Sequence, residues 1–218
     1  MVSTGKQVAN RRKELQQQWY KPLSRVQDVF LSAGALILLF PLMVILALLI
    51  LIDSPGASPF FTQTRVGLNG KHFTLYKFRT MRPGAEQELS GLLCRNEMTG
   101  PVFKMQHDPR VTRVGRLLRR TRLDELPQFW NVLKGDMRIV GPRPALPHEV
   151  AQYSSFDRQR LTVMPGMTCY WQIQPRCDRM NFHRWMVLDR KYISEQSFVT
   201  DWKIIAATLT ALLRMDGM

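Results

Sequence analysis

The sequence is short of cysteine and of the common nucleotide-binding motifs, and each shortage excludes a class of protein. Its 3 cysteines, Cys94, Cys169 and Cys177, show no Cys-x-x-Cys spacing. An odd number of cysteines without that spacing excludes a disulfide framework and a cysteine zinc site, and it is typical of reduced cytosolic thiols. The chain has no Gly-x-Gly-x-x-Gly motif and no P-loop, so nucleotide binding through those motifs is not indicated.

Acidic residues are also scarce, and the resulting charge predicts an anionic partner. The chain of 218 residues has 31 lysines and arginines against 17 aspartates and glutamates, which gives a formal net charge of +14. Such a charge favours a phosphorylated substrate, an acidic membrane surface or nucleic acid as the partner. A hydrophobic content of 45% is too high for a disordered basic tail.

One long segment without charge, residues 29–52, predicts attachment to a membrane. As a straight helix it would be about 36 Å long, enough to cross a bilayer core of about 30 Å. Pro41 lies in its middle and removes a backbone N–H, so we expect the helix to kink or break there. Basic residues flank the segment on both sides, whereas a simple span has them mainly on one side. The residues alone leave two alternatives open: a re-entrant helix broken at Pro41, or an ordinary kinked span.

The rest of the chain predicts the α/β class, in an α-rich form with a small sheet or hairpin. An Asn69-Gly70 turn signal lies between two β-prone stretches within residues 55–82. Alternation along the second stretch places Lys77 and Arg79 on the same face. Apolar spacing and turn residues predict further helices at 112–122, from near Asp124 onward and at 198–213, and a strand at 167–174.

Two adjacent carboxylates, Asp124 and Glu125, follow a run of arginines and are the strongest candidates for catalysis. Asp124 lies where a helix is expected to begin, so a structural role as its N-cap, worth about 1 kcal/mol, would also explain its position. The same position suits phosphate chemistry, because a helix N-terminus keeps a carboxylate ionised and attracts phosphate oxygens. Downstream, Pro142 and Pro144 hold Arg143 in an extended turn, and the guanidinium fork of arginine matches phosphate oxygens.

From about Asp28 to the C-terminus, the chain resembles the bacterial monotopic phosphoglycosyl transferases, the polyprenyl-phosphate sugar-1-phosphate transferase family. It looks like the compact core-domain form, without the additional N-terminal membrane helices of the long members. The resemblance rests on several motifs together: Asp53-Ser54-Pro55-Gly56, Gln63-x-Arg65-Val66-Gly67, Tyr76-Lys77-Phe78-Arg79-Thr80-Met81, Asp108-Pro109-Arg110-Val111-Thr112-Arg113-Val114-Gly115, Leu123-Asp124-Glu125-Leu126-Pro127-Gln128, Val140-Gly141-Pro142-Arg143-Pro144, Pro165-Gly166-Met167-Thr168 and Trp171-Gln172.

The resemblance implies a membrane enzyme that starts the assembly of a bacterial surface glycan. It implies a magnesium-dependent (Mg2+) transfer of sugar-1-phosphate from a UDP-sugar to a polyprenyl phosphate, usually undecaprenyl phosphate, with release of UMP. Residues 1–53 would form a basic segment and a re-entrant helix in the cytoplasmic membrane, and residues 54–218 a catalytic domain on the cytoplasmic face. No nucleic acid is expected as a partner, and the apolar segment allows a homodimer.

The resemblance also assigns roles to individual residues. Asp124 would attack the phosphorus that carries the sugar and form an aspartyl-phosphosugar intermediate. Asp124 and Glu125 would be the acidic ligands of magnesium. Cys169 and Pro175 stand where the family usually has glycine, and Pro175 directly precedes Arg176. The residues expected to bind phosphate are Lys77, Arg79, Arg119, Arg143 and Arg176.

Two other functions use the same residues. A membrane transferase could let the acceptor attack the UDP-sugar directly, without a covalent intermediate. A non-enzymatic scaffold could bind anionic lipid or nucleic acid through its basic surface, but an Asp124-Glu125 pair does not suit a polyanion-binding surface that lacks a metal. The sequence specifies neither the sugar nor the glycan pathway.

Overall fold

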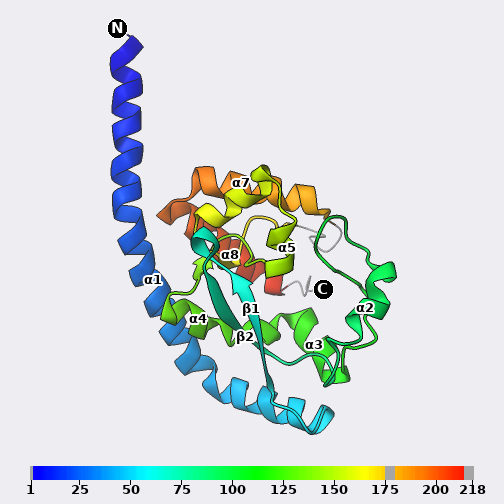
Figure 1. The fold of residues 1–218 in the computed structure, drawn as a ribbon. Helices are drawn as coiled ribbons and strands as arrows, with labels where there is room; N and C mark the ends of the chain where they lie inside the picture. The colour runs from blue at the N-terminus through cyan, green and yellow to red at the C-terminus, as the bar shows by residue number, and fades with distance from the viewer. Residues whose placement is uncertain (1, 175–179, 214–218) are drawn as a thin grey trace.

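The computed structural model describes residues 2–174 and 180–213 of the chain, which are rich in helix and include two small sheets (Figure 1). The strands are β1 (Phe60–Val66), β2 (His72–Phe78), β3 (Arg138–Val140) and β4 (Gly166–Thr168). The helices are α1 (Val2–Asp53), α2 (Leu89–Leu92), α3 (Arg113–Thr121), α4 (Gln128–Lys134), α5 (Pro147–Ala151), α6 (Ser155–Arg158), α7 (Phe182–Glu195) and α8 (Phe198–Leu213). Short 3-10 helices lie at Leu68–Gly70, Leu93–Arg95, Leu123–Glu125 and Gln159–Thr162.

The apolar segment forms the C-terminal part of α1, which is long and apolar enough from Trp19 to Asp53 to cross a membrane. The helix continues through Pro41, so the expected break is not an interruption of the helix here. A proline can bend a helix without ending it, because only one backbone hydrogen bond is lost. Figure 1 shows α1 changing direction along its course beside the domain.

One stripe of α1 packs against the domain, and the opposite stripe is exposed. Leu46 and Ile50 are buried with Phe78 of β2 and Leu118 of α3 in one hydrophobic cluster. The exposed apolar side chains include Ile37, Leu38, Phe40, Ile45, Leu48 and Ile52. An exposed apolar surface of this kind marks contact with a membrane or a partner.

The β1–β2 hairpin agrees with the expectation from the sequence. The two strands pair antiparallel, with Phe60 opposite Phe78 and Val66 opposite His72. Asn69 and Gly70 have φ of 53° and 81°, the left-handed conformation that this dipeptide favours. The hairpin places Lys77 near the end of β2, beside the first turns that follow α3.

The second sheet is shorter than the sequence predicted. β3 and β4 pair in parallel, but β4 ends at Thr168, and turns replace the rest of the strand expected at 167–174. A Cβ atom at Gly166 would lie 2.1 Å from the backbone nitrogen of Gly141, so only glycine permits these two backbone segments to approach so closely. The close approach fixes the backbone directly before Pro142.

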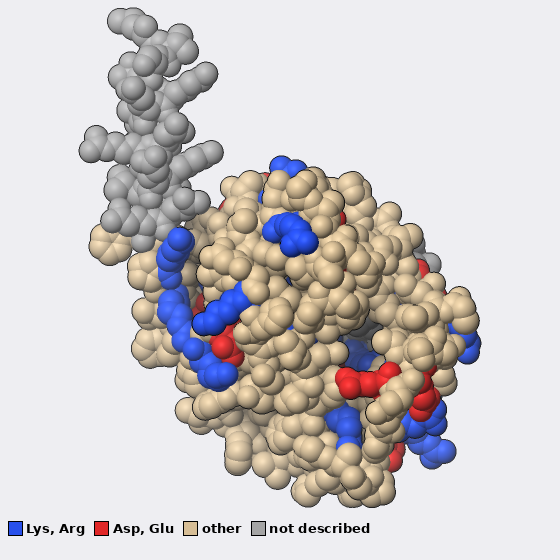
Figure 2. All heavy atoms as spheres, in the orientation of Figure 1, with Lys and Arg blue, Asp and Glu red and all other residues tan. Residues whose placement is uncertain are grey.

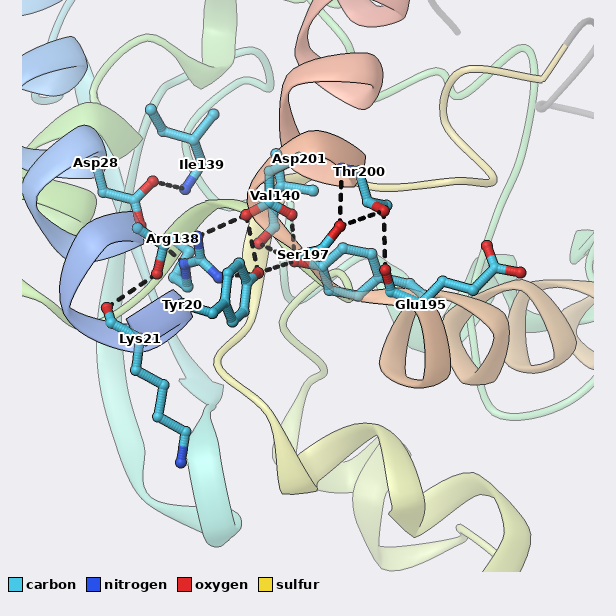
Figure 3. Close-up of polar contacts among 12 residues, drawn as sticks. Tyr20, Lys21, Asp28, Arg138, Ile139, Val140, Glu195, Ser197, Thr200 and Asp201 are labelled. Carbon is cyan, nitrogen blue, oxygen red and sulfur yellow. Dashed lines mark hydrogen bonds and ion pairs between the residues drawn. The ribbon is translucent and has the colours of Figure 1, made fainter. Parts of the chain in front are cut away.

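A cluster of charged and phenolic side chains joins α1 to the C-terminal helix α8 (Figure 3). Arg138 of β3 donates from Nε to Asp28 of α1 at 2.9 Å and from Nη2 to Asp201 of α8 at 2.7 Å. Tyr20 and Tyr192 donate their hydroxyl protons to the same Asp201 carboxylate at 2.8 and 2.9 Å. We call these five residues the Arg138 cluster. Every charge in it has an opposite charge and hydrogen-bond partners, as a buried ion pair requires.

Candidate active site

The turn after α3 determines where the two adjacent carboxylates lie. Arg122 ends α3 in the left-handed conformation, with φ of 57°. Asp124 and Glu125 then lie in the 3-10 helix Leu123–Glu125, and Pro127 is the N-cap of α4. The expectation that Asp124 caps the next helix is therefore wrong, because the reversal at Arg122 begins a separate turn ahead of α4.

An asparagine on α4 joins this turn to the hairpin. Asn131 is fully buried, and its side-chain Oδ1 accepts from the backbone N–H of Tyr76 at 3.0 Å. Its Nδ2 donates to the carbonyl oxygen of Thr74 at 2.7 Å. Asn131 thus bonds to the backbone of β2 as a neighbouring strand would, and this contact places Lys77 beside the carboxylates.

Lys77 contacts the two carboxylates unequally. Its Nζ lies 2.7 Å from Oε1 of Glu125, to which it donates a hydrogen bond, and 3.8 Å from Oδ2 of Asp124. We call Lys77, Asp124 and Glu125 the Lys77 cluster. The cluster brings together three of the residues that the sequence predicted for the site.

The surroundings move the pKa values of the two acids apart. Burial is the largest influence on Asp124 and raises its pKa to about 6, against the lowering effects of Lys77 and Arg119. Burial also acts on Glu125, but Lys77, Arg122 and Arg143 outweigh it, so the pKa of Glu125 lies below its ordinary value. Adjacent acids whose pKa values are separated in this way are typical of sites that assign them different roles.

The other predicted cations divide into three cases. Arg119 donates from Nε to Thr80 at 3.0 Å and lies near enough to Asp124 to affect its pKa. Arg143 affects Glu125 in the same way, and its Nη1 lies 3.8 Å from Oε1 of Glu149. Arg79 instead donates to the carbonyl oxygen of Ser54, just past the end of α1, at 2.7 Å. Arg176 lies outside the described residues.

The Lys77 cluster fits a magnesium ion as part of a substrate complex. Within residues 2–174 and 180–213, no group of three or more histidine, cysteine or acidic side chains is placed to hold a metal by itself. Magnesium is commonly held by one or two carboxylates together with water and substrate phosphates. The carboxylate of Asp124 is buried, and its cation Lys77 lies 3.8 Å away, so a further positive charge would offset the cost of that burial.

The molecular surface has a charged region that suits an anionic ligand and, elsewhere, an apolar region. Figure 2 shows a hollow where basic and acidic side chains meet, between the hairpin and α2. In the same view, the edge formed by the C-terminal part of α1 has almost no charged side chains. A charged hollow near an apolar edge suits a ligand that has a polar head and an apolar body.

The chain belongs to a family described as bacterial sugar transferase, whose profile matches residues 19–215. It is 47% identical over 166 residues to the galactosyl transferase CpsE of Streptococcus agalactiae, covering 76% of this chain and 37% of that protein. It is 38% identical over 199 residues to the undecaprenyl-phosphate galactose phosphotransferase of Salmonella typhimurium, covering 89% of this chain and 41% of that protein.

A third relative has a length similar to that of the matched region. The exopolysaccharide production protein ExoY of Sinorhizobium fredii is 38% identical over 194 residues, covering 87% of this chain and 85% of ExoY. By contrast, the chain spans only about two fifths of the length of the CpsE and Salmonella proteins. The matched region of all three relatives includes most of the domain that holds the Lys77 cluster.

Some parts of the site were not predicted from the sequence. Arg65, Glu149 and Arg160 surround the Arg143 turn, but only Arg65 lay in a recognised motif, and it had no assigned role. Arg160 and Glu149 lie in helical segments of only four and five residues, which are too short for an apolar period to indicate burial.

Proposed function

We propose that this protein transfers sugar-1-phosphate from a UDP-sugar to a polyprenyl phosphate and thereby begins the assembly of a bacterial surface glycan. The observation that carries the proposal is the Lys77 cluster, in which a buried carboxylate is held near one lysine beside a second, better-paired carboxylate. Two relatives, a galactosyl transferase and an undecaprenyl-phosphate galactose phosphotransferase, support the same reaction class.

In the first step, an oxygen of Asp124 attacks the phosphorus that carries the sugar. A bond forms between that oxygen and phosphorus, the phosphorus–oxygen bond to UMP breaks, and UMP leaves with the electron pair. Asp124 must be ionised to attack, and with a pKa of about 6 it is mostly ionised at neutral pH. Covalent catalysis by a carboxylate divides one difficult displacement into two easier ones.

In the second step, an oxygen of the polyprenyl phosphate attacks the same phosphorus. The bond from phosphorus to Asp124 breaks, the carboxylate is restored, and the product is a polyprenyl diphosphate sugar. Lys77, Arg119 and Arg143 serve both steps by balancing the charge of the two phosphate-bearing substrates, which occupy the site in turn. Asp124 and Glu125 would hold a magnesium ion, which would supply positive charge to neutralise the diphosphate.

The proposed reaction gives the membrane helix α1 a role, which is to hold the site at the bilayer surface. The phosphate of a polyprenyl acceptor lies at the bilayer surface, so the site should stand at the height of the lipid headgroups. Leu46 and Ile50 of α1 pack on Phe78, which directly follows Lys77, and this contact ties the membrane helix to the site. We propose that α1 enters the cytoplasmic membrane, turns near Pro41 and leaves by the same face, with the catalytic domain in the cytoplasm.

The proposed function is tested by an assay of sugar-phosphate transfer with the purified protein in a membrane mimetic. We expect release of UMP and formation of a lipid-linked diphosphate sugar that need a UDP-sugar, a polyprenyl phosphate and magnesium together. UDP-galactose is the first donor to test, followed by a panel of other UDP-sugars. Binding of anionic lipid without release of UMP from any UDP-sugar would instead support the scaffold function.

A further inference from the structure

The turn that carries Arg143 is held at every backbone carbonyl. Four consecutive carbonyl oxygens, from Pro142 to Ala145, each accept a hydrogen bond from outside the turn. The donors, in order, are the backbone N–H of Gly166 at 2.9 Å, the Arg160 guanidinium at 2.8 Å, the Arg65 guanidinium at 3.0 Å and the backbone N–H of Val66 at 2.8 Å. The two prolines further restrict the same backbone, because each fixes its own φ.

The two side-chain donors are both buried guanidinium groups. Arg65 lies at the end of β1 and Arg160 in the 3-10 helix Gln159–Thr162, and each is less than a tenth exposed. Arg160 has its own counter-charge, since its Nη2 lies 2.9 Å from Asp189 and its Nη1 donates to the Tyr153 hydroxyl at 2.8 Å. Arg65 has an uncharged partner instead, because its Nη2 donates to the amide oxygen Oε1 of Gln63 at 2.7 Å.

Burying two cations beside a third costs free energy unless the charges are paired and hydrogen-bonded. Burial, and then the charge of Arg143, lowers the pKa of Arg65 to about 9. The Arg143 side chain is 30% exposed, and its nearest carboxylate, Glu149 at 3.8 Å, is itself buried. Within the described part of the chain, the Arg143 guanidinium therefore has only a distant carboxylate partner, Glu149 at 3.8 Å. The backbone of the turn, by contrast, is held by four hydrogen bonds.

We propose that Arg65 and Arg160 are positioning residues that fix the Arg143 turn, so that Arg143 meets the diphosphate of the donor without rearrangement. This inference rests on the proposed function, since it assumes that Arg143 binds the donor. Arginine suits the task better than lysine, because its planar fork holds a carbonyl oxygen in a defined direction and still reaches a second partner. Neither positioning residue needs to touch the substrate.

A double-mutant cycle tests the proposal. We would combine Arg143→Gln with Arg160→Lys and measure kcat and KM for the most active UDP-sugar by release of UMP. We expect kcat/KM to fall about 100-fold in Arg143→Gln and about tenfold in Arg160→Lys. If Arg160 acts through Arg143, the double variant is no worse than Arg143→Gln alone, within about threefold.

The matched control is Arg138→Lys, which alters a buried arginine of the Arg138 cluster instead. It should lower the melting temperature as Arg160→Lys does, but leave kcat/KM within about threefold in both the native and Arg143→Gln backgrounds. Losses that multiply, so that the double variant falls about 1000-fold, would overturn the positioning role. If Arg160→Lys shows no cooperative melting, the same cycle is run with Arg65→Lys, because Arg65 donates to the next carbonyl oxygen of the turn, that of Pro144.

The cycle also separates this inference from the proposed function. A native protein that releases no UMP from any UDP-sugar would refute the proposed function. The cycle would then be read from calorimetric binding of UDP, where Arg160→Lys should weaken binding in the native background but not in Arg143→Gln. Multiplied losses in an active enzyme, or in UDP binding, would refute the positioning role alone.

Discussion

Among the described residues, one cation lies between two carboxylates in two places, and the two places differ in how completely the charges are paired. In the Arg138 cluster, both carboxylates lie within 2.9 Å of the guanidinium, and two tyrosines also donate to Asp201. In the Lys77 cluster, the lysine lies 2.7 Å from Glu125 but 3.8 Å from Asp124. The first arrangement suits a joint between helices, and the second leaves one buried carboxylate without a close counter-charge, as the proposed nucleophile requires.

The largest expected difference between the clusters is in catalysis. Asp124→Asn replaces the attacking carboxylate with a neutral, poorly nucleophilic amide, so we expect the release of UMP to fall by at least about 1000-fold. Asp201→Asn alters the Arg138 cluster and should leave kcat/KM within about threefold at temperatures where the protein is folded. UMP release by both variants under identical conditions checks this contrast. Loss of activity in both, with both folded, would mean that the two clusters are not separate in function.

The next contrast is in stability. Arg138→Met leaves two buried carboxylates without their cation, and we expect the free energy of unfolding to fall by about 3–5 kcal/mol. Lys77→Met should cost less stability, because Lys77 and its closer partner Glu125 are each about a quarter exposed, yet it should abolish most activity. Denaturant unfolding in one detergent, together with the UMP assay, measures both effects. A larger loss of stability in Lys77→Met would contradict the structural role given to the Arg138 cluster.

A smaller effect is expected from the second carboxylate of the site. Glu125→Gln keeps the shape of the side chain but removes the negative charge of a proposed magnesium ligand. Activity at low magnesium should therefore fall about tenfold to 100-fold. Raising the magnesium concentration should restore part of the loss. The exposed Glu88→Gln, which alters a surface pair with Arg82, is the control. Full activity of Glu125→Gln at low magnesium would refute the metal role.

The smallest effect is a difference in how pH changes stability. The folded-state pKa of Asp124 is raised from 3.8 to about 6, so its contribution to stability is present at low pH and is lost as the pH rises through about 6. Relative to the native protein, Asp124→Asn should therefore become more stable by about 1–2 kcal/mol between pH 4.5 and pH 8. Asp189, whose pKa burial also raises to about 6, is present in both proteins and cancels. An unchanged difference across this range would contradict the raised pKa.

The sequence was informative where local patterns decide the structure. The Asn69-Gly70 hairpin, α3 and α8 follow from turn residues and apolar spacing, and the structure confirms all three. Lys77, Asp124 and Glu125 were chosen from motifs, and the fold brings them together. The reaction and the roles of these residues stay predictions until they are measured.

Other features depend on contacts between distant segments, which local patterns do not encode. The Arg138 cluster joins residues more than 60 positions apart in the chain, and its residues are individually unremarkable in sequence. The N-cap prediction for Asp124 failed because a non-glycine residue, Arg122, adopts the left-handed conformation, which sequence alone rarely predicts. The strand at 167–174 was predicted too long because turns replace it after Thr168.

The covalent step is the central claim, and mass spectrometry tests it most directly. The native protein, Asp124→Asn and the control Asp157→Asn, which alters a helix cap on α6, are incubated with the active UDP-sugar in the absence of acceptor. We predict one phosphosugar adduct on the peptide that contains Asp124, with equal release of UMP, in the native protein and the control but not in Asp124→Asn. An adduct on another residue, or an active enzyme that releases UMP only when acceptor is added, would contradict the account, and the second result would establish direct attack.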